Sequence, residues 1–195
     1  MEMIGISGGV CAAKGFCANG IHCGIRKNKT KNDLSLIFSE KRAAVACVYT
    51  TNKVKGAPLV VTKKNVADGY AQAVICNSGN ANTCNADGEE IAEKTCALLA
   101  DELHISARDV VVASTGVIGQ PLGIEPFARG MRELVSGLGN KSREAAYGIM
   151  TTDTKVKEAA VEFEAGGKKC RIGGIAKGSG MIHPNMATML VFITT

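Results

Sequence analysis

Aromatic and histidine side chains are scarce in this sequence of 195 residues. It has no tryptophan, aromatic residues make up 4% of it, and histidine occurs three times. Proteins that bind single-stranded nucleic acid stack bases on aromatic side chains, so this shortage argues against a nucleic-acid partner. The net charge of +5 comes partly from one run, RKNKTK at 26–31. We interpret that run as a solvated loop between two strands, and the mild positive charge as suited to small anionic substrates.

Long apolar runs are also absent. Charges or glycines interrupt every hydrophobic segment before it reaches the ~18 residues that a membrane-spanning helix needs. The first ten residues, MEMIGISGGV, have neither the basic start nor the long apolar stretch of a secretion signal. We therefore expect a cytoplasmic protein with no membrane partner, which agrees with its 46% apolar and 21% charged residues.

The eight cysteines include no C-x-x-C pair. Because no export signal is evident, we expect reduced and mostly buried thiols. The densest group is Cys11, Cys17, His22 and Cys23. It contains one close pair, and adjacent residues rarely chelate a single ion. We therefore expect no metal site and no cofactor.

The hydrophobic pattern predicts one α/β domain without repeats or linkers. Strands are expected where short apolar runs lie between polar residues, and helices where apolar residues recur every three to four positions. The predicted strands are 33–38, 43–49, 71–76 and 109–114, and the predicted helices are 89–103 and 125–138. Strand–loop–helix units of this kind indicate layered mixed sheets flanked by helices.

The C-terminal part of the sequence predicts a hairpin and a final strand. Apolar and charged residues alternate on both sides of Gly166-Gly167, which is typical of a two-residue primed turn. The sequence then ends in TMLVFITT, an apolar and β-branched strand. Because such a strand needs neighbours to cover it, we expect the polypeptide to continue, in the same chain or in a separate one.

Two glycine-rich segments match known motifs incompletely. GISGG at 5–9 fits the nucleophile-elbow pattern, but that motif needs a strand before it and a helix after it, and four residues precede this one. A flexible glycine turn is the simpler interpretation. In the segment 173–181, Lys177 precedes its glycine, whereas a P-loop lysine follows one, so phosphate binding is only weakly indicated.

The segment 173–190 offers a different chemistry. A small residue followed by threonine, at the junction between a flexible stretch and a strand, is what self-cleavage requires. The Thr188 hydroxyl can attack the Ala187 carbonyl carbon, and water can hydrolyse the ester that results. Upstream, Thr115 and Gly116 end a strand, where a hydroxyl and an N–H can form an oxyanion hole. On composition alone, an ordinary strand-start threonine and an ordinary polar turn are the simpler interpretations.

Taken together, these segments resemble the glutamate N-acetyltransferase (ornithine acetyltransferase) family of arginine biosynthesis. The matching segments are GGVCAAKGF, AVICNSGNAN, VVASTGVIGQPL, IMTTDTK, GGIAKGSGMIHPNMATML and FITT. They occur in the family's order over nearly the whole chain. The sequence departs from the family at Cys11, Cys17 and Cys23, where threonine, lysine or alanine is expected, and these positions are peripheral to the chemistry.

The resemblance implies a fold like the N-terminal-nucleophile sandwich and a precursor that cleaves itself between Ala187 and Thr188. Residues 1–187 would be the α chain, and residues 188–195 would be the start of the β chain. The family pattern further implies that the two chains stay together, as a heterotetramer of two α and two β chains.

The family pattern also implies the site residues. It makes Thr188 the nucleophile and the pair Thr115 and Gly116 the oxyanion hole. The substrate-binding positions that it implies are Thr151, Lys177 and Thr188. The remaining substrate-binding residues, including a glutamate of the β chain, would lie beyond residue 195.

The implied reaction is a ping-pong transfer of acetyl from N2-acetylornithine to glutamate through an ester on Thr188. The freed α-amine of Thr188 would act as the base, because the pKa of an α-amine is ~7.7–8.0 against ~10.4 for lysine. Use of acetyl-CoA as a second donor stays open. So do two other functions: an amidase or aminopeptidase that transfers the acyl group to water, and a phosphate- or nucleotide-binding module.

Overall fold

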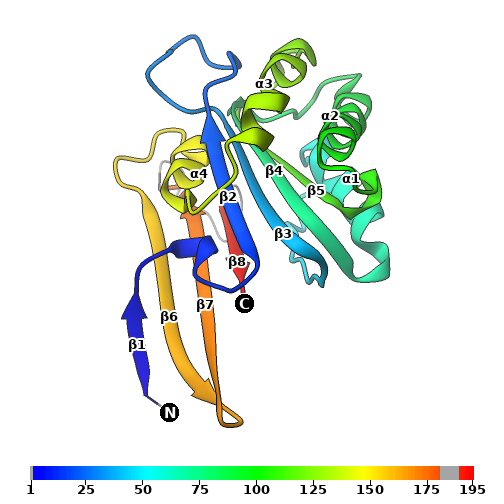
Figure 1. Ribbon diagram of the computed structural model, residues 1–195. Coiled ribbons are helices and arrows are strands. Elements are labelled where there is room, and N and C mark those ends of the chain that lie inside the picture. The colour runs from blue at the N-terminus through cyan, green and yellow to red at the C-terminus, as the bar shows by residue number, and fades with distance from the viewer. Residues whose placement is uncertain (1, 181–188) are drawn as a thin grey trace.

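The computed structural model describes residues 2–180 and 189–195, and within them the strands form two four-stranded sheets (Figure 1). One sheet has the order β1-β6-β7-β8 and is antiparallel throughout. The other has the order β2-β3-β4-β5 and is mixed, because β4 and β5 run parallel. The strands are β1 (Met3–Ile6), β2 (Phe16–Ile21), β3 (Leu34–Ala44), β4 (Tyr70–Asn80), β5 (Val110–Val117), β6 (Lys157–Ala165), β7 (Lys168–Lys177) and β8 (Leu190–Thr194).

Helices cover both faces of the mixed sheet. Three helices, α1, α2 and α3, pack on the face of the mixed sheet that is turned away from the other sheet. The fourth, α4, lies between the two sheets and contacts strands of both (Figure 1). The helices are α1 (Ala57–Asn65), α2 (Gly88–Leu103), α3 (Glu125–Ser136) and α4 (Ser142–Ile149), with short 3-10 turns at η1 (Gly9–Cys11), η2 (Val66–Asp68) and η3 (Ala107–Asp109). The predicted class, layered sheets flanked by helices, is confirmed.

Two apolar clusters form the core of the described structure. The larger lies between the mixed sheet and the outer helices, where Leu99 of α2 and Leu134 of α3 are completely buried. The smaller surrounds α4 between the sheets, and Ile149 and Ile175 are its largest buried members. The space between the sheets is therefore largely apolar around α4.

The predicted helices are confirmed with small changes at their ends. The helix predicted over 89–103 begins one residue earlier, and the one predicted over 125–138 ends at Ser136. The glycine hairpin is also confirmed, since Gly166 and Gly167 have φ values of 58° and 71° and join β6 to β7. Two helices, α1 and α4, were not predicted: α1 has almost no apolar periodicity, and α4 has only eight residues.

The predicted strand over 43–49 is wrong beyond Ala44. Ala44 pairs with Tyr70, the first residue of β4, so the following residues have no neighbouring strand to pair with. β4 is in turn longer than predicted and continues through the polar residues 77–80. It does so because β5 pairs with it in parallel along this stretch, which satisfies backbone groups that a loop would have exposed to water.

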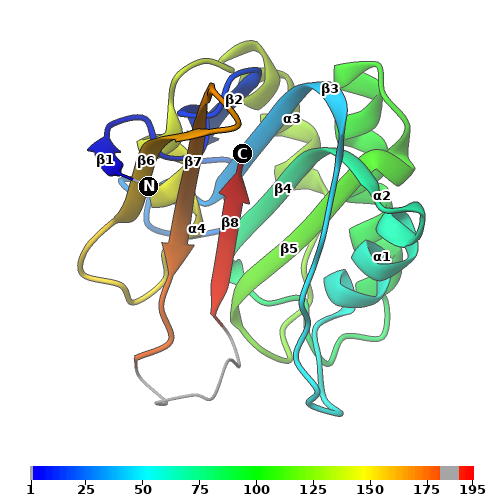
Figure 2. The same cartoon turned by 90° about the horizontal axis from the view of Figure 1, so that it is seen from below.

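The sheet that contains β8 has one apolar face that the described residues leave uncovered. The register places Ile193 beside Gly174 and Val191 beside Ala176, on the side opposite the buried Ile175. Ile193 is 67% exposed. We call this surface the outer face; its exposed large side chains are Met3, Ile172, Val191 and Ile193. β8 is an edge strand of this sheet and lies beside the mixed sheet (Figure 2).

Among the described helices, none combines the length and the hydrophobicity that crossing a membrane would require.

Candidate active site

The parallel strands β4 and β5 end in an unusually close backbone contact. Gly79 pairs with Gly116, and both have positive φ values, 98° and 139°. A Cβ atom added to Gly116 would lie 2.3 Å from the carbonyl carbon of Gly79, which no real side chain tolerates. Only glycine therefore permits this approach, and the contact fixes where the preceding residue of β5 points.

Thr115 is the residue that this contact positions. Its side chain is on the same side of β5 as Ala113, which packs against the cluster around α4, because side chains alternate along a strand. The hydroxyl therefore faces the space between the sheets, and the residue is 8% exposed. Its neighbour in the register, Ser78, uses its own hydroxyl to donate to the Gly148 carbonyl at 2.6 Å. Thr115 makes no side-chain hydrogen bond with any other described residue.

Lys177 ends β7 on the same side as the buried Ile175, so it too faces the space between the sheets. It is 4% exposed, and its Nζ donates to the Gly178 carbonyl oxygen at 2.7 Å. Burial lowers the pKa of Lys177, while the nearby Asp153 carboxylate and Cys76 thiol oppose that shift. A nearly buried ammonium of this kind favours an anionic ligand.

Asp153 connects Thr151 to the end of β7. Its carboxylate accepts hydrogen bonds from the Lys157 ammonium at 2.6 Å, the Gly178 N–H at 2.9 Å and the Thr151 N–H at 3.3 Å. Burial by itself would raise the pKa of Asp153, but these three donors lower it below its ordinary value. The ionised carboxylate therefore holds the loop after α4 beside the end of β7, which brings Thr151 near Lys177.

Arg26 was missed by the sequence analysis, which took the whole run 26–31 as a solvated loop. The structure turns Arg26 inward: its Cγ would lie 2.7 Å from a Cβ on Gly79, and its guanidinium donates to the Met150 carbonyl next to Thr151. Burial lowers the pKa of Arg26, an effect that the Asp33 carboxylate opposes. No sequence signal distinguishes this residue from the five exposed residues that follow it.

A cavity of about 730 Å³ opens beside these groups. Arg26, Lys31, Thr151 and Asp153 are among the side chains that line it. Of the predicted site residues, Thr151 lines this cavity, while Thr115 and Lys177 do not line it and face the space between the sheets. The other predicted pair, Ala187 and Thr188, lies outside the described residues, but Leu190, two positions later in the sequence, pairs with Lys177.

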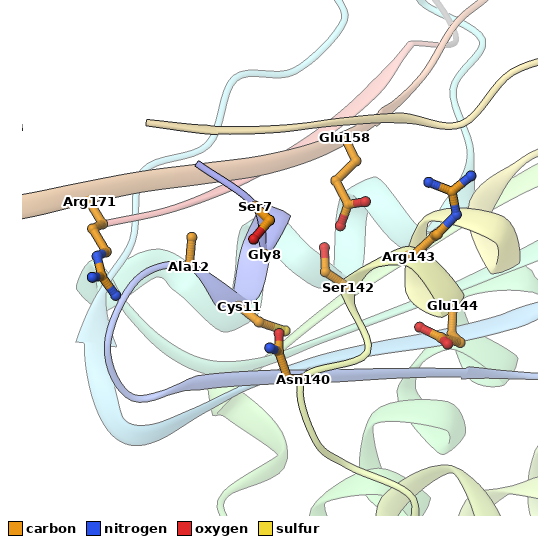
Figure 3. A pocket seen from close by; sticks show the side chains of 10 residues that line it. All are labelled: Ser7, Gly8, Cys11, Ala12, Asn140, Ser142, Arg143, Glu144, Glu158 and Arg171. Atoms are coloured by element: carbon orange, nitrogen blue, oxygen red, sulfur yellow. The ribbon is translucent and has the colours of Figure 1, made fainter. Parts of the chain in front are cut away.

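A second cavity, of about 350 Å³, contains none of the predicted site residues (Figure 3). Ser7 of the GISGG segment lines it, but a three-residue 3-10 turn follows this serine instead of the helix that a nucleophile elbow needs. Burial raises the pKa of Cys11 in this cavity to about 11, so its thiol is protonated at neutral pH. The Glu158 side chain of β6 points toward Ser142, the first residue of α4 (Figure 3).

The densest group of cysteines in the sequence lies in the segment 11–23. Within residues 2–180 and 189–195, no three side chains of histidine, cysteine, aspartate or glutamate are arranged to hold a metal ion. His22 instead lies 3.1 Å from Asp33, and the Cys23 N–H donates to the same carboxylate at 2.7 Å.

Most of the chain matches one known protein family. The model of the ArgJ family matches residues 17–195. This chain belongs to the ArgJ family. The resemblance to glutamate N-acetyltransferases inferred from the sequence segments is therefore confirmed.

Similar proteins agree with the family assignment. The chain is 45% identical to the "Arginine biosynthesis bifunctional protein ArgJ" of Caldanaerobacter subterraneus over 192 residues, and 47% identical to the "Glutamate N-acetyltransferase" of Methanocaldococcus jannaschii over 195 residues. Each match covers 97% of this chain and 47% of the relative, so the chain spans about half the length of the curated relatives it matches.

A solved structure of the family has the same fold. It is the ornithine acetyltransferase of Mycobacterium tuberculosis complexed with ornithine, which superimposes with a TM-score of 0.87 at 34% identity. The match covers 97% of this chain and 100% of the solved chain. The two chains therefore share one fold over nearly their whole lengths.

The glycine contact between β4 and β5 predicts a specific pattern of stability. Gly116→Ala forces a Cβ into the Gly79 backbone, so we expect the free energy of unfolding to fall by at least ~2 kcal/mol more than for Gly119→Ala. Gly119 also has a positive φ, 72°, but has open space around it, and its substitution should cost only ~1 kcal/mol. Urea unfolding of both full-length variants measures the difference; equal losses would contradict the close contact.

The burial of Lys177 predicts a pH-dependent cost to stability. The pKa of Lys177 is lower in the folded than in the unfolded state, so its charged form disfavours folding. Stability therefore rises with pH through the interval between the two pKa values. Lys177→Met should therefore melt at a higher temperature than the parent at pH 7, and its advantage should shrink as the pH approaches ~10.4. A variant that melts at a lower temperature would show that Lys177 serves the fold instead of a ligand.

Proposed function

We propose that this chain is the front part of a self-cleaving glutamate N-acetyltransferase, which transfers acetyl from N2-acetylornithine to glutamate. The observation that carries the proposal is that Thr115 and Lys177 are buried on strands that face the space between the sheets, in a chain that belongs to the ArgJ family. Asp153 joins the loop of Thr151 to Gly178, the residue after Lys177. The Thr115 hydroxyl and the Gly116 N–H suit the oxygen of an acetyl group. The nearly buried Lys177 ammonium suits the carboxylate of the amino acid that carries this acetyl group.

Cleavage is the first step of the proposal. The Thr188 hydroxyl attacks the Ala187 carbonyl carbon, the acyl group moves from nitrogen to oxygen, and water hydrolyses the ester. Residues 1–187 then end in a carboxylate, and Thr188 begins a new chain with a free α-amine. The coverage of relatives supports this step: the solved chain is matched along its entire length, whereas the curated sequences extend about as far again.

Acetyl transfer follows in two half-reactions. The free α-amine takes the proton of the Thr188 hydroxyl, whose oxygen attacks the acetyl carbon of N2-acetylornithine; ornithine leaves with that proton on its amine. The amine of glutamate then attacks the acetyl ester and releases Thr188. In both steps the Thr115 hydroxyl and the Gly116 N–H stabilise the negative charge on the acetyl oxygen, and Lys177 binds the α-carboxylate of the amino acid.

The remainder of the polypeptide is the proposed partner. The outer face exposes Ile172, Val191 and Ile193, and exposed apolar patches of this kind mark contact surfaces. A β chain that begins at Thr188 starts on this sheet through β8 and would cover that face. Two α and two β chains would form the assembly. Transfer of acetyl from acetyl-CoA would add a second activity, as the word bifunctional in the relatives' names suggests.

Removal of the nucleophile tests the proposal directly. In the full-length protein, Thr188→Ala should abolish both cleavage and acetyl transfer, because one hydroxyl performs both. Thr188→Ser keeps a hydroxyl and should still cleave. Intact-mass analysis gives the chain lengths, and transfer of labelled acetyl from N2-acetylornithine to glutamate gives the activity. A processed and active Thr188→Ala protein would refute the assignment.

The oxyanion hole gives a second test. Thr115→Val keeps the shape of the side chain but removes its hydroxyl, so kcat should fall by ~10²–10³-fold while the melting temperature stays within a few degrees of the parent. Thr115→Ser should retain most of the activity. Unchanged kinetics in Thr115→Val would remove this residue from the site.

A further inference from the structure

We propose that Arg26 binds the side-chain carboxylate of the acceptor amino acid and thereby sets the preference for glutamate. This inference rests on the proposed function and goes beyond it, because it assigns a residue outside the family's motif positions and a part of the substrate. The cavity that Arg26 lines is the proposed subsite.

The position of Arg26 places it at the edge of the proposed reaction centre. Its aliphatic stem covers Gly79, the partner of Gly116 at the end of β5. Its guanidinium donates to the Met150 carbonyl, one residue before Thr151. The charge of Arg26 also contributes to the lowered pKa of Lys177. One cation thus lies between the oxyanion strand and the loop that carries Thr151.

The backbone around Arg26 is fixed by a buried carboxylate. Asp33 is fully buried and accepts hydrogen bonds from the N–H groups of Cys23 at 2.7 Å, Gly24 at 3.3 Å and Arg26 at 2.8 Å. These bonds hold the turn after β2 in one shape, so the Arg26 side chain is directed inward while the residues after it extend into solvent. The result is a positioned cation, which binds a carboxylate with little ordering cost.

The Arg26 guanidinium has N–H donors without an acceptor among the described residues. An arginine has five N–H donors, and the described residues accept one of them, at the Met150 carbonyl. The Nε atom is buried and has no hydrogen-bond partner among the described residues. A guanidinium with unbonded N–H groups that lines a cavity is a strong site for a carboxylate, because two paired N–H groups match the two carboxylate oxygens.

The charges around the cavity select the sign of the ligand. Arg26 and Lys31 both line it, while the one lining aspartate, Asp153, is already bound by Lys157 and two backbone N–H groups. Asp33, whose charge also acts on Arg26, is fully buried and does not line the cavity. Among the described residues, no lining carboxylate is therefore left to receive the side-chain ammonium of ornithine. The carboxylate on the side chain of glutamate fits this field, so the subsite serves the acceptor and not the donor.

The test compares acceptors in the self-cleaved, full-length enzyme. Arg26→Met removes the charge and keeps the stem over Gly79. We expect its KM for glutamate to rise about ten- to a hundredfold, as loss of a charged hydrogen bond predicts, while its KM for N2-acetylornithine changes less than about threefold. The preference for glutamate over glutamine, measured as the ratio of kcat/KM, should collapse by a similar factor. A merely structural role would change both KM values and leave that ratio intact.

Two further variants keep the outcome interpretable. Lys29→Met removes one positive charge from an exposed position of the same loop and should leave the ratio unchanged. Arg26→Lys keeps the charge but not the paired donors, so it should give a smaller loss in the same direction. If Arg26→Met fails to cleave or fold, the ratio in Arg26→Lys decides.

The possible failures are distinct. An unchanged glutamate-to-glutamine ratio in an active Arg26 variant would overturn this inference and leave the proposed function standing. A parent enzyme that transfers acetyl to no amino acid would overturn both.

Discussion

The close contact of Gly79 with Gly116 is the constraint on which the candidate site depends. It lets the parallel strands β4 and β5 end together, with backbone against backbone and no side chain between them. Because the side chains of β5 alternate, the same register directs Thr115 into the space between the sheets. The bare surface of Gly79 is also where the stem of Arg26 lies. One backbone contact thereby positions a hydroxyl, an N–H and a cation.

Two buried carboxylates arrange the rest of the site around that contact. Asp33 shapes the turn that carries Arg26, and Asp153 attaches the loop of Thr151 to the end of β7 beside Lys177. Asp33 accepts from three backbone N–H groups, and Asp153 accepts from two backbone N–H groups and the Lys157 ammonium, so both serve as fixed structural anions. The positive charges of Arg26 and Lys31 line the cavity, which is consistent with substrates that carry carboxylates.

The sequence predicted those parts of the fold whose determinants are local. The Gly166-Gly167 turn and the apolar stripe of α2 each follow from a few neighbouring residues, and both are confirmed. The end of β3 could not be predicted, because it depends on where β4 begins to pair. Arg26 was missed for the same reason: the carboxylate that turns it inward and the glycine that it covers are identified only by long-range contacts. The roles of Thr115, Thr151 and Lys177 came from motif resemblance and stay predictions.

The central claim is that the ends of β4, β5 and β7 form one site for an acetylated, carboxylate-bearing amino acid. A crystal structure of the self-cleaved, full-length enzyme with N-acetylglutamate tests it most directly. We expect the acetyl oxygen within roughly 2.7–3.1 Å of the Thr115 hydroxyl and the Gly116 N–H, with the two carboxylates on Lys177 and Arg26. N-acetylglutamate bound instead in the cavity beside Glu158, with these strand ends unoccupied, would contradict it.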